Sequence, residues 1–176
     1  MRHNKTATTL PGHQRHTLLL PVLQAGMPLS SILLADDDTE DCDIFIEVVH
    51  HIKPGLPVNL VHNGEQLMRL LHDTHEDELP GLVFLDLNMP LKNGQECLTE
   101  IRTNKKFKAV PVVVYSTSSS RQHIDDTFLN GANFYFPKPD SYNDLKVIVS
   151  RIFALDWKQF MQPQKDKFVI SINHFK

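Results

Sequence analysis

The chain of 176 residues has few cysteines, no long apolar run and no excess of positive charge. Its two cysteines, Cys42 and Cys97, lie in apolar patterns typical of helices, which argues against a disulfide framework and favours a reducing compartment, the cytoplasm. No apolar run approaches the roughly 20 residues that a membrane span needs. The net charge is −3, and residues 1–29 hold three basic and no acidic side chains, so the rest of the chain carries −6. We therefore expect neither membrane insertion nor nucleic-acid binding.

Short apolar runs alternate with helical patterns from residue 31 onward. The predicted strands are Ile32–Ala35, Val58–Val61, Leu82–Asp86, Val110–Ser116 and Ala132–Phe136. The segments between them repeat apolar residues at i, i+3, i+4 and i+7, as a helix with one buried stripe does. Five βα units predict an α/β fold with an open, mainly parallel sheet and helices on both of its faces.

The same pattern predicts three parts of the chain. Residues 29–153 form the globular domain, residues 1–28 a disordered leader, and residues 154–176 a C-terminal tail. The tail holds aromatic side chains interrupted by Pro163, and two alternatives stay open: it packs on the domain, or it binds a partner. Within the domain, Asn63 and Asn93 have the spacing of helix N-caps, each with Gln or Glu three residues later.

Four of the predicted strands end in polar or charged side chains. The four strand ends are "ADDD" (35–38), Asp86, "YSTS" (115–118) and "FPKP" (136–139). Because parallel strands end at one edge of the sheet, we expect these side chains to meet there. Carboxylates about 4–5 Å apart repel by about 4 kcal/mol per pair at an effective dielectric of about 20. Mg²⁺ prefers such oxygen ligands, and together with Lys138 it would balance Asp36, Asp37 and Asp86.

The same cluster suits phosphoryl transfer, which needs countercharge around the phosphoryl oxygens and an aligned oxygen nucleophile. Asp86 ends the middle strand and is the best-placed nucleophile, since carboxylates serve as covalent phosphate acceptors. Among the other acids, we expect Asp38 to lie in the loop or cap the first helix. Asp41 and Asp43 are expected to be solvated acids that favour the helix dipole.

Four blocks of the sequence, in this order and at these separations, resemble the receiver domain of two-component response regulators. They are "ILLADDDTED", "LVFLDLNMPLKNG", "VPVVVYSTS" and "FYFPKP". The resemblance covers residues 31 to 153 and extends to stand-alone receivers that carry no effector domain. It implies a flavodoxin-like (βα)5 fold with strand order 2-1-3-4-5, and a signalling module rather than an enzyme.

The resemblance also implies a role for each site residue. Asp86 would accept a phosphoryl group from a phosphohistidine on a sensor histidine kinase or a histidine phosphotransfer protein. Asp37 and Asp86 would bind Mg²⁺ directly, Asn88 would supply its backbone carbonyl, and Asp36 would act through water. Lys138 would pair with the phosphate.

Two further positions match the switch of the family. Ser116 would hydrogen-bond the phosphoryl oxygens and move on activation, and the ring of Tyr135 would then turn inward. Because neighbouring strand side chains point to opposite faces, Thr117 stays open as an alternative to Ser116. The Lys138–Pro139 bond is expected to be cis, while Pro137, which removes a backbone donor, departs from the family pattern.

Two other functions remain open from the sequence. A phosphatase similar to the haloacid dehalogenases would use an aspartate after the first strand, but the run Asp36-Asp37-Asp38-Thr39 is one residue short of that family's D-x-D-x-T/V motif. A degenerate receiver would act only as a binding module. In the favoured interpretation the chain, as a monomer or a homodimer, presents its fourth helix, fifth strand and fifth helix to an unidentified protein target or relays the phosphoryl group.

Overall fold

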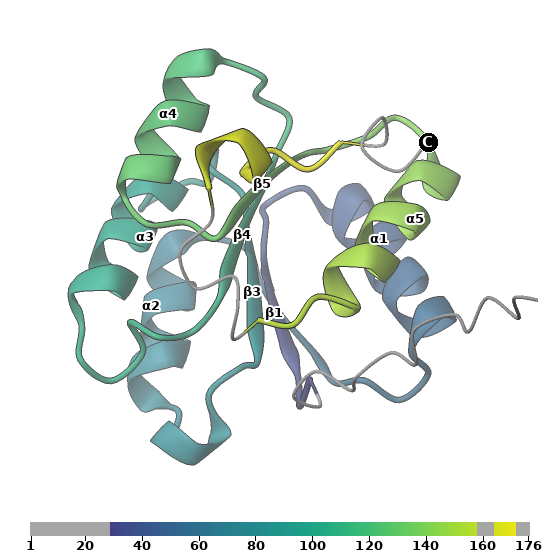
Figure 1. The fold of residues 1–176 in the computed structure, drawn as a ribbon. Coiled ribbons are helices and arrows are strands. Elements are labelled where there is room, and N and C mark those ends of the chain that lie inside the picture. The colour runs from purple at the N-terminus through teal and green to yellow at the C-terminus, as the bar shows by residue number, and fades with distance from the viewer. Residues whose placement is uncertain (1–28, 158–163, 172–176) are drawn as a thin grey trace, which may run out of the picture.

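Five short parallel strands form the centre of the molecule (Figure 1). They are β1 (Ile32–Ala35), β2 (Val58–Val61), β3 (Leu82–Leu85), β4 (Val112–Ser116) and β5 (Phe134–Pro137). Their order in the sheet is β2-β1-β3-β4-β5, so the predicted flavodoxin-like topology is confirmed. The structure is a computed structural model that describes residues 29–157 and 164–171, and the predicted leader at 1–28 lies outside the described residues.

Helices cover both faces of the sheet (Figure 1). One face carries α2 (Gly64–Asp73), α3 (Gly94–Thr103) and α4 (Arg121–Leu129), and the other carries α1 (Thr39–Ile52) and α5 (Tyr142–Phe153). Two 3₁₀ turns, η1 (Glu76–Glu78) and η2 (Lys165–Lys167), complete the described elements. None of the described helices is long and apolar enough to cross a membrane.

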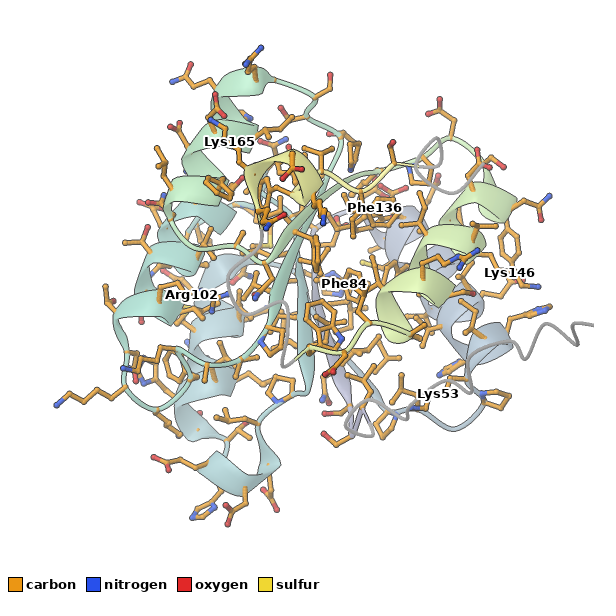
Figure 2. The ribbon with its side chains drawn as sticks, viewed as in Figure 1. Lys53, Phe84, Arg102, Phe136, Lys146 and Lys165 are labelled. Carbon is orange, nitrogen blue, oxygen red and sulfur yellow. The ribbon has the colours of Figure 1, made fainter. Side chains whose placement is uncertain are left out.

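Alternation along the strands divides the apolar residues into two cores. Val83 and Val114 pack with α2, α3 and α4, whereas Phe84 and Phe136 pack with α1 and α5 (Figure 2). The three central strands are buried on both faces, which explains why their sequences are almost wholly apolar. In such a sheet a charged side chain can escape the core only at a strand end.

Side-chain caps start several helices where the sequence predicts them. Asn63 caps the start of α2. Asn93 caps the start of α3 in a full capping box, in which the Glu96 carboxylate accepts a hydrogen bond from the Asn93 backbone N–H. Asp38 caps α1 by accepting from two backbone N–H groups, so its predicted role as a cap is confirmed. These bonds satisfy N–H groups that the first turn of a helix leaves without partners.

The structure decides two expectations about the C-terminal part of the chain, the packing of the tail and the conformation of the Lys138–Pro139 bond. The described part of the tail packs on the domain, because Phe168 is 1% exposed and joins the core beneath α4. The predicted cis Lys138–Pro139 bond is wrong, since the described residues contain no cis peptide bond. The trans form is the ordinary preference of an X-Pro bond.

Gly94 allows α3 to start directly against the end of β3. A Cβ at this position would clash with the Asp86 carbonyl oxygen and with the backbone of Leu87. We expect Gly94→Ala to lower the free energy of unfolding by at least about 2 kcal/mol, because the backbone of the loop would have to move. Urea unfolding measures this, with Gln95→Ala as the neighbouring control; equal stability of the two variants would contradict the prediction.

Candidate functional site

Strand register places two buried carboxylates side by side. Ala35 of β1 pairs with Leu85 of β3, so the residues that follow them, Asp36 and Asp86, leave the sheet together. The backbone N–H of Asp86 donates to the Ala35 carbonyl at 2.9 Å, and that of Asp36 donates to the Val61 carbonyl at 3.0 Å. Both acids are almost fully buried, at 0% exposure for Asp36 and 4% for Asp86. The predicted convergence of acids from separate strands is therefore observed.

Lys138 brings the positive charge to these acids. It follows β5, and its backbone N–H donates to the Ser116 carbonyl at the end of β4. Its ammonium nitrogen lies 2.7 Å from Asp36 Oδ2, 2.8 Å from Asp41 Oδ2 and 3.8 Å from Asp86 Oδ2. Burial alone would lower the pKa of Lys138, but its contacts with Asp36 and Asp41 outweigh burial and raise it. The lysine therefore stays charged.

Asp36 remains short of hydrogen-bond donors. Its Oδ1 accepts from the Asp38 backbone N–H at 3.1 Å. The buried Oδ2 forms an ion pair with the Lys138 ammonium at 2.7 Å, and no further donor to it is found among the described residues. Burial raises the pKa of Asp36, although Lys138 opposes this effect. An additional cation near this oxygen would lower the cost of keeping Asp36 ionised.

The donor set fits a divalent cation. Carboxylate oxygens of Asp36, Asp37 and Asp86 lie within 4.8 Å of one another, and Asp37 is exposed to solvent. Hard oxygen ligands with one side open to water are what Mg²⁺ requires. Asn88, two residues after Asp86, is exposed in the loop between β3 and α3. The use of its carbonyl as a ligand stays a prediction.

Asp41 is a member of the site that the sequence does not reveal. The prediction of a solvated acid in the first turn of α1 holds in part for Asp41, whose side chain is 36% exposed, but it missed the contact of its Oδ2 with Lys138. The two residues are 97 positions apart in the chain. Asp41 in the first turn of α1 therefore faces the site, whereas Asp43 is exposed as predicted. Its position in the first turn is the only local signal of this role.

The hydroxyl positions at the end of β4 differ sharply in burial. Ser116 is fully buried, whereas Thr117 is exposed. Tyr135 of β5 is also fully buried, and its hydroxyl donates to the Ser118 carbonyl at 2.7 Å. Burial raises the pKa of Tyr135, although hydrogen bonds at Ser118 and Ser116 oppose this effect. This burial favours Ser116 over Thr117 as the residue that faces the interior.

A hollow of about 320 Å³ opens beside the site. It is lined by the β3–α3 loop, including Asn88, the start of α3, and Gln122, His123 and Asp126 of α4. The His123 ring nitrogen Nδ1 lies 2.8 Å from the Ser118 hydroxyl. The loop that follows β4 therefore connects the hollow with Tyr135.

Comparison of the sequence with known protein families identifies the family to which the chain belongs. The sequence profile of the response regulator receiver domain matches residues 32–150. The chain belongs to the response regulator receiver family. Receiver domains are signalling modules of two-component systems, and the matched region of this receiver contains every site residue described above.

Two relatives match most of this receiver chain. Response regulator Rcp1 of Synechocystis is 32% identical over 128 residues, which cover 71% of this chain and 87% of Rcp1. The probable methanogenesis regulatory protein FilR2 of Methanothrix harundinacea is 30% identical over 146 residues, covering 81% of this chain and 94% of FilR2.

Solved structures show the same fold. The phosphorylated cyanobacterial phytochrome response regulator RcpA matches with a TM-score of 0.65 and 31% identity, over 70% of this chain and 91% of RcpA. The Mn²⁺-bound form of Rcp1 matches with a TM-score of 0.65 and 29% identity, over 77% of this chain and 99% of Rcp1.

The contact between Lys138 and Asp36 also predicts the stability of the receiver without metal. We expect Lys138→Ala to lower the free energy of unfolding by about 3 kcal/mol in EDTA, because Asp36 loses its counterion. Adding Asp36→Asn should restore at least about 1 kcal/mol.

Urea unfolding of both variants is the measurement. The control is Lys167→Ala, which removes an exposed lysine. Equal stability of the Lys138 and Lys167 variants would show that Asp36 does not depend on Lys138.

Proposed function

We propose that Asp86 accepts a phosphoryl group from a phosphohistidine on a partner kinase or phosphotransfer protein, and that Mg²⁺ assists. The burial and contacts of Asp86 carry this proposal. Its Oδ1 accepts from the Leu87 backbone N–H at 2.6 Å, and its Oδ2 faces the Lys138 ammonium at 3.8 Å. One oxygen is thus held in place, and the other points toward the cation that would meet an incoming phosphoryl group.

The proposed transfer is a nucleophilic displacement at phosphorus. An Asp86 carboxylate oxygen forms the new P–O bond, the P–N bond to the donor imidazole breaks, and the imidazole leaves with its electron pair. Lys138 would leave Asp41 and move to the phosphoryl oxygens, a short movement because its nitrogen already lies 3.8 Å from Asp86 Oδ2. The transferred group keeps a countercharge throughout.

Asp36, Asp37 and Asp86, with the carbonyl of Asn88, would hold the Mg²⁺ ion. When bound, the ion supplies positive charge to the transferring oxygens. The Oδ2 of Asp36 pairs with Lys138 and can still accept a further hydrogen bond, which supports a role in hydrogen-bonding the water of that ion. Asp37 supports direct ligation, because its carboxylate is exposed at the mouth of the cluster.

Ser116 and Tyr135 would transmit the change. The buried Ser116 hydroxyl would bond the phosphoryl oxygens, and the inward Tyr135 ring would accompany the phosphorylated state. The altered face of α4, β5 and α5 would then bind a protein target, or the phosphoryl group would pass to another protein. A modification can shift this equilibrium only by stabilising one state more than the other.

Phosphorylation predicts a change of mass. Incubation with acetyl phosphate and Mg²⁺ should add one phosphoryl group to the intact protein, and Asp86→Asn should prevent this because the nucleophile is lost. Intact-mass spectrometry measures the adduct, with the exposed acid variant Asp43→Asn as a control that keeps it. An adduct that persists in Asp86→Asn would move the acceptor to another residue.

Metal binding predicts a shift in thermal stability. Mg²⁺ should raise the melting temperature, because an ion that binds only the folded state stabilises it. We expect Asp37→Asn to weaken Mg²⁺ binding at least about tenfold, which corresponds to about 1.4 kcal/mol. Calorimetric titration with Mg²⁺ measures this, and Asp43→Asn should bind as the unchanged chain does.

Two other functions are not favoured. A phosphatase of the haloacid dehalogenase type would use Asp36, but this residue is fully buried against Lys138. Its signature would be phosphate-ester turnover that Asp36→Asn abolishes and Asp86→Asn spares. A degenerate receiver would lack part of the acidic cluster, the lysine or the hydroxyl, and this chain has all of them.

A further inference from the structure

The C-terminal segment 164–171 pairs with the outer edge of β5. Tyr135 and Val169 form a parallel bridge. The backbone N–H of Tyr135 donates to the Phe168 carbonyl at 2.9 Å, and that of Ile170 donates to the Tyr135 carbonyl at 2.8 Å. Segment 164–171 therefore occupies the edge of the α4–β5–α5 face, the face that the proposed function assigns to the protein target.

Pro137 limits this pairing to one position. Lys138, one residue later, donates its N–H inward to β4, so the Pro137 nitrogen points outward like that of Tyr135. Proline has no N–H, and the outer edge therefore offers no donor beyond Tyr135 on this strand. The departure from the family pattern at Pro137 thus concentrates the backbone pairing on Tyr135.

Side chains on both sides of the edge reinforce the pairing. Phe168 packs into the core beneath α4, while Ile170 packs into the core beneath α5, so the segment straddles β5. The Phe168 ring meets the Phe128 ring of α4 edge to face, with centroids 5.1 Å apart. The Lys165 ammonium, on the α4 side of the sheet in Figure 2, lies 2.8 Å from Asp125 Oδ1. The contact combines apolar burial with complementary charge.

Phe168 also bears directly on the inward position of Tyr135. The centroids of the two rings lie 6.3 Å apart in the same core, and Phe168 fills the space between Tyr135 and α4. The Tyr135 hydroxyl is meanwhile bonded to Ser118 on the inner side. If the Tyr135 ring turned toward the outside, it would need the space that the docked segment occupies.

We propose that residues 164–171 are a built-in ligand of the α4–β5–α5 face, docked in cis when Tyr135 lies inward and released when it turns outward. The coupling between docking and Asp86 rests on the proposed function. Since phosphorylation favours the inward ring, it strengthens docking of the segment, so the face that the phosphorylated state presents to a protein target carries the segment on its β5 edge. By linkage, docking strengthens phosphoryl binding by the same factor.

Hydrogen exchange tests the docking by itself. In the full chain without ligand, we expect Phe168→Ala to speed exchange of the Tyr135 and Ile170 amides at least about tenfold, because loss of a buried ring frees the segment. Asp166→Ala, an exposed position in the same segment, should leave both rates unchanged. Equal rates in the two variants would overturn the docking.

A charge exchange and a dilution series sharpen this test. Lys165→Glu should speed the same two amides, and adding Asp125→Lys should slow them again, because the ion pair is restored with opposite polarity. The rates should not change with protein concentration. Protection that is lost on dilution would mean that a second copy supplies the segment, and it would overturn docking in cis.

Beryllofluoride, a phosphoryl mimic, tests the coupling. With Mg²⁺ it should slow exchange of the Tyr135 and Ile170 amides, and it should bind Phe168→Ala about fivefold more weakly than Asp166→Ala. Equal binding to the two variants would overturn the coupling. If beryllofluoride does not bind even the unchanged chain, the proposed function and the coupling both fail, while the ligand-free exchange rates still decide whether the segment docks.

Discussion

The structure depends on one buried ammonium group that faces several carboxylates. Asp36 and Asp86 cannot both be buried as anions without a cation, and Lys138 supplies that cation. This requirement ties β1, β3 and β5 to a common edge, because the lysine reaches the acids only when the three strands end together. The backbone bond from Lys138 to the Ser116 carbonyl holds that alignment.

The single charge of the Lys138 ammonium does not balance the carboxylates that surround it. One lysine faces Asp36, Asp41 and Asp86, with Asp37 at the mouth of the cluster. A divalent cation would therefore complement the site rather than compete with Lys138. Lysine contacts at 2.7, 2.8 and 3.8 Å describe a cation shared among carboxylates, which can move to a new anion over a short distance.

Tyr135 connects this chemistry with the surface. Its hydroxyl reaches the loop after Ser116, while its backbone N–H and carbonyl hold segment 164–171. One residue of β5 thus meets the loop after β4 through its side chain and the C-terminal segment through its backbone. Such a residue can link a change at Asp86 to a change at the edge of the sheet without any large movement of the sheet.

Local patterns in the chain are enough to predict the five βα units, the helix cap at Asn63 and the place of Asp86 at a strand end, while the strand order follows from the family resemblance. These features depend on periodicity and on the meeting of parallel strand ends at one edge. Three others needed the folded molecule: the contact of Asp41 with the site lysine, the burial of Ser116, and the packing of Phe168 in the core. Each of these depends on how elements far apart in the chain are placed, because a side chain's partners across the fold leave no trace in its neighbouring residues.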